Sequence, residues 1–192
     1  AFLIHFHYMK KKDWTADDML EFTESKTQRM IETKMGHRDS SKLIAHIESF
    51  KPKKVLEIGC GYGRNLLLFN SKISITGIDF SPSMLKQAKE LCKGKKNIKL
   101  IKLNVINGLD SFKDNSFDVV FTDTVLAHIP DKDIAKVIDE IKRIAKHRAI
   151  IKEADKRKRK LLQILFKKWH EIHRNYSPYG FQFVKDADFL EW

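Results

Sequence analysis

Cysteine is scarce in this 192-residue sequence, and long apolar runs are absent. The two cysteines, Cys60 and Cys92, are too few for a disulfide framework and have no metal-binding motif around them. We therefore expect a reducing, cytoplasmic environment and predict no metal site. No apolar stretch reaches the roughly eighteen residues that a membrane-spanning helix requires, so membrane insertion is not expected. The apolar start at residues 1–9 precedes its lysines, which is the reverse of a secretory signal.

The composition describes one globular domain with a basic surface. Hydrophobic residues make up 42% of the chain and charged residues 32%, and the length suits one substantial core. The formal net charge of +12 favours anionic partners, although a lysine-rich composition is equally compatible with a general property of the source proteome. We expect an N-terminal helical extension or lid over residues 1–50 and a main domain over residues 51–192.

Strand and helix patterns alternate from residue 53 onward, which predicts an α/β fold with a doubly wound, mostly parallel sheet. The predicted strands are Lys54–Ile58, Ser74–Asp79, Ile98–Leu103, Phe117–Thr122 and Arg148–Lys152. The predicted helices are Thr15–Met35, residues 41–50, Arg64–Asn70, Pro82–Lys93, Asp131–Lys146 and Lys158–His173. Room for one further strand at most remains after the last helix, so we expect a shortened C-terminal part, from a reduced fold or from a fragment of a longer protein.

Three alternating glycines follow the first predicted strand, at Gly59, Gly61 and Gly63. Each removes a Cβ where the backbone turns sharply or where a ligand comes close. A dinucleotide fingerprint would have a further glycine where this chain has Arg64, and the Gly-Lys-Ser/Thr ending of a phosphate loop is absent. Asp79 ends the second strand, where a carboxylate can accept both hydroxyls of a ribose. The pattern therefore predicts a nucleoside-binding βαβ unit.

Four ordered motifs between about residues 53 and 153 resemble the class I S-adenosylmethionine-dependent methyltransferases. They are Glu57-x-Gly59-x-Gly61-x-Gly63, Asp79-Phe80-Ser81-Pro82-Ser83-Met84-Leu85, Phe117-Asp118-Val119-Val120 and Val125-Leu126-Ala127-His128-Ile129-Pro130-Asp131. The resemblance implies a Rossmann-like fold, S-adenosyl-L-methionine as cofactor and methyl transfer as the activity. The family's sheet usually closes with an antiparallel hairpin of two strands, for which the short C-terminal part leaves too little room.

The resemblance also implies a set of cofactor-binding residues at the carboxyl ends of the strands. The set is Glu57, Gly59, Cys60, Gly61, Gly63, Asn65, Asp79, Phe80, Ser81, Met84, Asn104, Val105, Thr122 and Thr124. Free N–H groups of the helix expected near Arg64 would face the cofactor carboxylate. Four members have structural alternatives: Glu57 as a carboxylate held by backbone N–H groups, Asp79 as a helix N-cap, and Phe80 and Met84 as plain core residues. Asn104 stands where the family commonly has an aspartate that bonds the adenine amino group, and its carbonyl oxygen can accept the same bond.

The acceptor side is described by His128 and by the residues after Glu153. His128 is the candidate catalytic base, because a base helps when the attacking oxygen or nitrogen carries a proton; the alternative is that it packs on the cofactor or caps a turn. The run Lys156–Lys160 follows the fifth strand and is either a solvated helix face or a site for an anionic group. Candidate substrate-binding residues are Lys156, Arg157, His173 and Tyr176, from a mixed aromatic and basic set that alternatively attaches the last helix to the sheet.

The sequence favours a methyltransferase acting on oxygen or nitrogen of a small, anionic acceptor. It lacks the Asn/Asp-Pro-Pro-Tyr/Phe signature of many amino-directed nucleic-acid and protein enzymes. Two alternatives stay open: an RNA- or protein-directed methyltransferase whose basic surface holds a nucleic acid or an acidic protein, and a non-catalytic, cofactor-binding partner subunit. The acceptor and the oligomeric state are not predicted.

Overall fold

The computed structural model of the chain describes residues 40–153, 176–185, 187 and 189–192. The helices expected at Thr15–Met35 and Lys158–His173 lie outside these residues. Within the described ranges, no helix combines the length and the apolar character that crossing a membrane would take.

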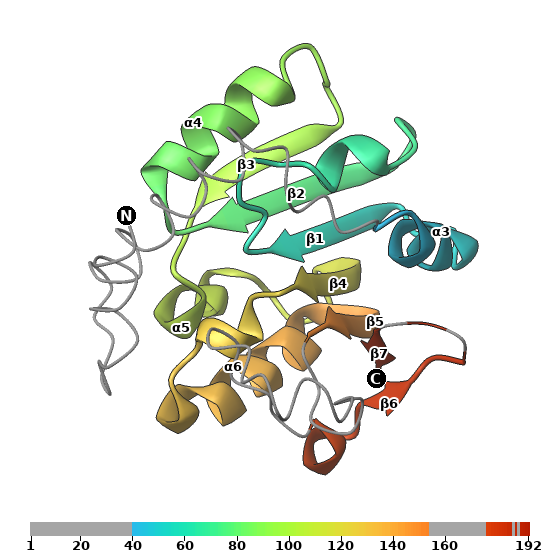
Figure 1. Ribbon diagram of the computed structural model, residues 1–192, viewed down its shortest axis with the longest axis vertical. Helices are drawn as coiled ribbons and strands as arrows, with labels where there is room; N and C mark the ends of the chain where they lie inside the picture. The colour runs from blue at the N-terminus through green and yellow to red at the C-terminus, as the bar shows by residue number, and fades with distance from the viewer. Residues whose placement is uncertain (1–39, 154–175, 186, 188) are drawn as a thin grey trace, which may run out of the picture.

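A seven-stranded sheet in the order β3-β2-β1-β4-β5-β7-β6 forms the centre of the molecule (Figure 1). Strands β1 to β5 are parallel, and β7 runs antiparallel to both β5 and β6. The strands are β1 (Lys54–Ile58), β2 (Ser74–Asp79), β3 (Ile98–Lys102), β4 (Phe117–Asp123), β5 (Ala145–Lys152), β6 (Gln182–Phe183) and β7 (Leu190–Glu191). Strand order reverses between β1 and β4, so ligands of this kind of sheet bind beyond the carboxyl ends of these two strands.

In the described part of the chain, four α-helices accompany the sheet: α3 (Ser41–Ser49), α4 (Pro82–Leu91), α5 (Val105–Gly108) and α6 (Asp131–Ile144). Short 3-10 turns occupy Leu66–Leu68, Leu109–Ser111, Leu126–His128 and Ser177–Tyr179. Helix α4 begins after Ser81, whose hydroxyl accepts the Met84 N–H, and Pro82 fits the first turn because its missing N–H would have no partner there.

Successive strand residues alternate between two hydrophobic clusters, one on each face of the sheet. Val119 and Phe121 belong to the cluster that contains α3 residues and Leu85 of α4, whereas Val120 belongs to the cluster with α6. The period of two along a strand therefore explains why helices cover both faces. Because α3 shares a core with β1, the domain boundary expected at residue 50 falls between two elements that pack together.

The C-terminal hairpin corrects one expectation from the sequence. Two strands follow residue 176, not one at most, because β6 and β7 contain only two residues each. Side chains hold these short strands: Glu191 lies 2.6 Å from both His46 Nε2 of α3 and Arg148 Nε of β5. Lys142 Nζ of α6 lies 4.7 Å from the centroid of the Trp192 ring, a cation–π contact. Strand pairing this short leaves no periodic signal in the sequence.

The helix predicted at Arg64–Asn70 is also corrected. Only the 3-10 turn Leu66–Leu68 forms there, and Phe69 is already extended. Leu66 is buried below the glycine turn, against Gly77 of β2. A 3-10 turn thus takes the place of the expected α-helix, and residues 59–73 offer no α-helix N-terminus to a ligand at the end of β1.

Gly77 should be intolerant of a side chain, even though its backbone has an ordinary strand conformation. A Cβ at this position would lie 2.9 Å from Cys60 Sγ and 2.9 Å from Leu66 Cδ1. We expect Gly77→Ala to lower the free energy of unfolding by about 1–3 kcal/mol in urea denaturation, as for other overpacked sites. Adding Cys60→Ala should restore part of this loss; a double variant no more stable than Gly77→Ala would contradict the assignment of the clash.

Candidate functional site

The glycine turn after β1 lies at the carboxyl edge of the sheet and is fastened to the end of β2. The Gly61 N–H donates to Asp79 Oδ2 at 2.9 Å, and the Ser81 N–H donates to Asp79 Oδ1 at 2.9 Å. Gly59 has φ +68°, and a Cβ there would lie 2.3 Å from Val125 Cγ2. Gly61 has φ +54°, and a Cβ there would meet no atom of the described residues within 4 Å. The turn therefore has to be glycine, and the described residues leave space beside Gly61.

Asp79 is the buried carboxylate around which this turn is arranged. Its side chain accepts hydrogen bonds from two backbone N–H groups. The residue that caps α4 is Ser81, so Asp79 is not the N-cap of this helix. Burial raises its pKa above the usual range, and the backbone N–H donors lower it in part. Each carboxylate oxygen accepts one of these bonds and has capacity for another.

A second network of polar side chains joins the end of β1 to the end of β4. Asn65 Nδ2 donates to Glu57 Oε1 at 2.7 Å and to Asp123 Oδ2 at 3.3 Å. Glu57 is therefore held by an amide side chain and not, as the alternative from the sequence had it, by backbone N–H groups. Burial raises the pKa of Glu57 well above its usual value, since the Asn65 bond offsets only part of the desolvation.

Two buried acceptors in this network have no hydrogen-bond partner within the described part of the chain, Glu57 Oε2 and Asn65 Oδ1. Both residues are only 2% exposed. Leaving buried polar atoms without a partner is costly, and such atoms in a native fold are explained by water or a ligand. They lie beside the glycine turn, where the sequence predicts the cofactor.

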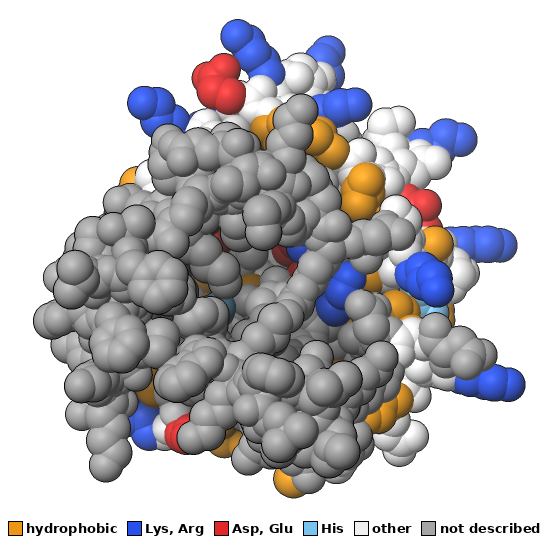
Figure 2. Space-filling model, in the orientation of Figure 1, with side chains coloured by type: hydrophobic (Ala, Val, Ile, Leu, Met, Phe, Trp, Pro, Cys, Tyr) orange, Lys and Arg blue, Asp and Glu red, His pale blue; other side chains and the backbone are white. Residues whose placement is uncertain are grey.

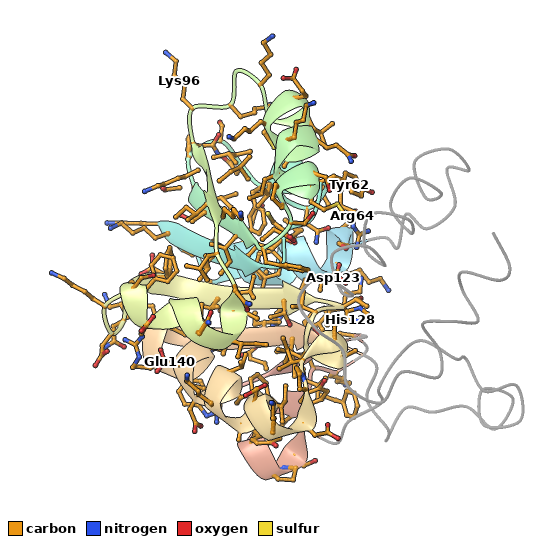
Figure 3. The ribbon with its side chains drawn as sticks, turned by 90° about the vertical axis from the view of Figure 1, so that its left-hand side faces the viewer. Tyr62, Arg64, Lys96, Asp123, His128 and Glu140 are labelled. Atoms are coloured by element: carbon orange, nitrogen blue, oxygen red, sulfur yellow. The ribbon has the colours of Figure 1, made fainter. Side chains whose placement is uncertain are left out.

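Asp123 is the centre of the same network on the β4 side. Its Oδ2 accepts bonds from Arg64 Nη2 at 2.8 Å and from the Ser40 hydroxyl at 2.9 Å, and its Oδ1 accepts one from the Thr124 hydroxyl at 3.1 Å. The Arg64 side chain thus links the glycine turn to the end of β4. Figure 3 shows Tyr62, Arg64, Asp123 and His128 along one edge, with Lys96 and Glu140 away from it.

Glu153 organises the loop that carries His128. Its carboxylate accepts the N–H groups of Val125, Leu126 and Ala127, at 2.8, 3.0 and 3.3 Å, and the Thr122 hydroxyl at 3.0 Å. Burial nevertheless raises the pKa of Glu153 to about 7. The loop begins at Thr124, a β-branched residue with φ +63°, which is a strained conformation. Its N–H donates to the Lys152 carbonyl at 2.9 Å.

The structure brings most of the predicted site residues to this edge but assigns several of them structural contacts. Thr122 is fully buried and donates to Glu153. Asn104 Oδ1 accepts the Ile106 N–H and caps α5, so the atom expected to meet adenine already has one partner. Cys60 turns its thiol toward Gly77, and burial raises the pKa of that thiol. Met84 is buried, and Phe80 and Val105 are half-buried.

The predicted acceptor residues fall into two groups. Lys156, Arg157 and His173 lie outside the described residues. Tyr176 is described and is fully buried in the cluster that contains α6, which favours attachment of the last segment to the sheet over contact with a substrate. His128 is half-buried at the end of its 3-10 turn, and its N–H donates to the Val125 carbonyl.

Sequence reasoning did not select Asp123, Arg64, Ser40 or Glu153 as site residues. Asp123 ends β4, and Glu153 directly follows β5. The rule that ligands bind at the carboxyl ends of parallel strands, applied to every acidic residue there, would have found both. No local signal points to Ser40, which is 83 positions from Asp123 in the sequence.

Comparison with known proteins gives a consistent result. A family model described as "Methyltransferase domain" matches residues 55–148. The chain is 30% identical over 115 residues to a phosphatidylethanolamine N-methyltransferase of Cereibacter sphaeroides, covering 59% of this chain and 55% of the relative. It is 30% identical over 122 residues to a trans-aconitate 2-methyltransferase of Rhodopseudomonas palustris, covering 62% and 41%. The chain thus spans about half of these curated relatives.

Among solved structures, the DhpI–SAM–HEP complex superposes with a TM-score of 0.65 at 17% identity, covering 93% of this chain and 98% of that one. At this identity the likeness concerns the fold.

The pKa of Glu153 gives a stability prediction with a defined sign. Between pH 4.5 and about 7 the unfolded chain loses this proton while the folded chain keeps it, so stability falls as the pH rises through this window. Relative to Glu153→Gln, the wild-type free energy of unfolding should fall by about 3 kcal/mol between pH 4.5 and 7.5. Urea denaturation of both proteins at several pH values measures this difference. If the free energy of unfolding of the wild type relative to Glu153→Gln stayed constant or rose between pH 4.5 and 7.5, the raised pKa of Glu153 would be contradicted.

Proposed function

We propose that this chain acts as a class I S-adenosylmethionine-dependent methyltransferase and transfers a methyl group from S-adenosylmethionine to oxygen or nitrogen of a small, anionic acceptor. The observation that carries the proposal is the pairing of Asp79 with the glycine turn. A buried carboxylate at the end of β2 lies one hydrogen bond from Gly61, where the backbone is open to a ligand.

The described residues fit the proposed cofactor. Asp79 would accept the ribose hydroxyls, since each of its oxygens accepts one backbone N–H and can accept another bond. The open space at Gly61 would admit the backbone contact that a larger residue would prevent. The orphaned oxygens of Glu57 and Asn65 are acceptors for a cationic amino group, reached directly or through water. Phe80 and Met84 would offer apolar surface to adenine.

When bound, the cofactor supplies a methyl group on a sulfonium, which an acceptor oxygen or nitrogen takes in an in-line displacement. The protein's task in such a reaction is to hold the two groups in line and to exclude water. His128 is the proposed base for an acceptor that carries a proton, because a histidine changes charge near neutrality. The loop that carries it is held by three backbone N–H bonds to Glu153, which would keep His128 in place.

A small anionic acceptor is favoured by two observations. The two curated relatives described above carry the names of small molecules, one a phospholipid and the other a tricarboxylate. Arg64 lies at the edge where the strands end, 23% exposed at its side chain and fixed by Asp123. A guanidinium held in this way is suited to a carboxylate or phosphate group. Incubation with methyl-labelled S-adenosylmethionine and pools of carboxylates, amines and phosphate esters tests the activity; label in none of the pools would count against it.

Asp79→Ala should weaken binding of S-adenosylhomocysteine at least tenfold, measured by calorimetry, because a hydrogen-bonded carboxylate at the ribose is lost. Asp110→Ala is the matched control, because it removes the same charge from a residue that is exposed in the 3-10 turn Leu109–Ser111. The melting temperature of both variants distinguishes a lost ligand contact from a loosened glycine turn. Unchanged affinity in Asp79→Ala would refute this assignment.

A further inference from the structure

One edge of the molecule carries a concentration of lysines that the proposed methyl transfer does not use. Residues 86–102 run from the middle of α4 to the end of β3 and contain seven exposed lysines and one acidic residue, Glu90. We name this group the lysine edge: Lys86, Lys89, Lys93, Lys95, Lys96, Lys99 and Lys102. Figure 2 shows basic side chains gathered over this part of the molecule, at the top of the view, with α4 and β3 in the same place in Figure 1.

The lysine edge accounts for most of the charge imbalance in the described structure. Outside residues 86–102, the described residues include fifteen lysines and arginines against thirteen acidic residues, which is nearly neutral. A basic composition inherited from a whole proteome would be spread over all surfaces. Within the described residues most of the excess lies on one edge, so composition alone does not explain it.

The edge lysines also differ from other basic residues in their surroundings. Arg64, Arg143 and Arg148 each form an ion pair with a carboxylate. Within the described residues, none of the seven edge lysines forms an ion pair with a carboxylate at 4.0 Å or less. Their charges therefore add to a positive field that no internal acid cancels, and such a field attracts anions over about a Debye length.

The lysines lie along β3, which among the described strands pairs with β2 alone and forms one edge of the sheet. Lys86 and Lys89 are spaced as neighbours on one face of α4, and Lys93, Lys95 and Lys96 follow in the turn before β3. Lys102 pairs in register with Asp79, so the lysine edge ends beside the candidate site. Lysines on an edge strand also discourage strand pairing between molecules. That function needs only residues on β3 and leaves those of α4 unexplained.

The side chains of this edge indicate which polyanion they suit. Residues 82–102 contain no aromatic residue and no arginine. Base stacking and bidentate phosphate contacts, on which single-stranded RNA recognition relies, are therefore lacking here. Instead, Leu91, whose side chain is exposed (46%) at the end of α4, stands between the exposed Lys89 and Lys93 in the sequence. Lysines around an exposed apolar side chain suit the interface of an anionic membrane.

We propose that the lysine edge docks this domain on the surface of membranes that contain anionic phospholipids. The association is peripheral: lysines attract the phosphate groups, and Leu91 enters the boundary between headgroups and acyl chains. It is independent of the proposed methyl transfer, since no lysine of this edge belongs to the candidate site.

Co-sedimentation with vesicles tests the proposal. The full chain should bind vesicles of phosphatidylcholine with 30–40% phosphatidylglycerol and not vesicles of phosphatidylcholine alone, at roughly 0.1 M salt. The variant K89Q/K93Q/K96Q/K99Q should lose at least tenfold in affinity, because each lysine near an anionic membrane surface contributes about a fivefold gain and four are removed. The matched control K42Q/K113Q/K132Q/K185Q removes four exposed lysines elsewhere and should change the affinity less than threefold.

Three results would overturn the proposal. Equal losses in the two quadruple variants would mean that net charge, not this edge, attracts the vesicles. Absence of binding to anionic vesicles by the wild-type chain would remove the docking surface altogether. If the edge variant lost affinity for a double-stranded RNA but not for vesicles, the partner would be a nucleic acid. Leu91→Gln supports the apolar contact if it weakens binding by the same factor at low and at high salt, and speaks against it if binding is unchanged.

Discussion

Four buried carboxylates at one edge of the sheet impose the main constraint on this structure. Glu57 is near the end of β1, Asp79 ends β2, Asp123 ends β4 and Glu153 follows β5. Each is less than 10% exposed, and burial raises the pKa of Glu57, Asp79 and Glu153. Carboxylates taken out of water need hydrogen-bond donors, and their charges disfavour one another at short range.

The loops at this edge are shaped by supplying those donors. The glycine turn offers the Gly61 N–H to Asp79, and the loop after β4 offers three consecutive N–H groups to Glu153. Asn65 joins Glu57 to Asp123, and Arg64 adds the positive charge nearest to them. Strain at Thr124, of the order of 1–3 kcal/mol, is tolerated because the following residues satisfy Glu153. The geometry of the site and the conformation of its loops therefore depend on the same hydrogen bonds.

The sequence predicted the parallel strands well and the connections poorly, for physical reasons. Strands β1 and β2 have the predicted bounds, because apolar runs between turn residues are a local signal. Strands β6 and β7 escaped notice because two residues carry no periodicity, and they depend on contacts such as that between Glu191 and His46. Asp79 and the glycines could be selected because their partners lie in the same motif. Asp123 could not be fully interpreted, because its donor Ser40 comes from another element.

The same carboxylates give a reason why this edge would suit the proposed cofactor over a dinucleotide. A pyrophosphate is anionic and would lie against the glycine turn, beside the buried carboxylates of Glu57 and Asp79. S-adenosylmethionine carries a sulfonium and an ammonium group against one carboxylate, so its net charge is positive and the field of these two side chains would favour it. A cation near Glu57 or Asp79 also lowers the pKa of the carboxyl and opposes the effect of burial. Arg64, standing where a dinucleotide fold has glycine, offsets part of the negative charge without reversing it. The acidic edge, and not the glycines alone, thus distinguishes the two kinds of nucleoside ligand.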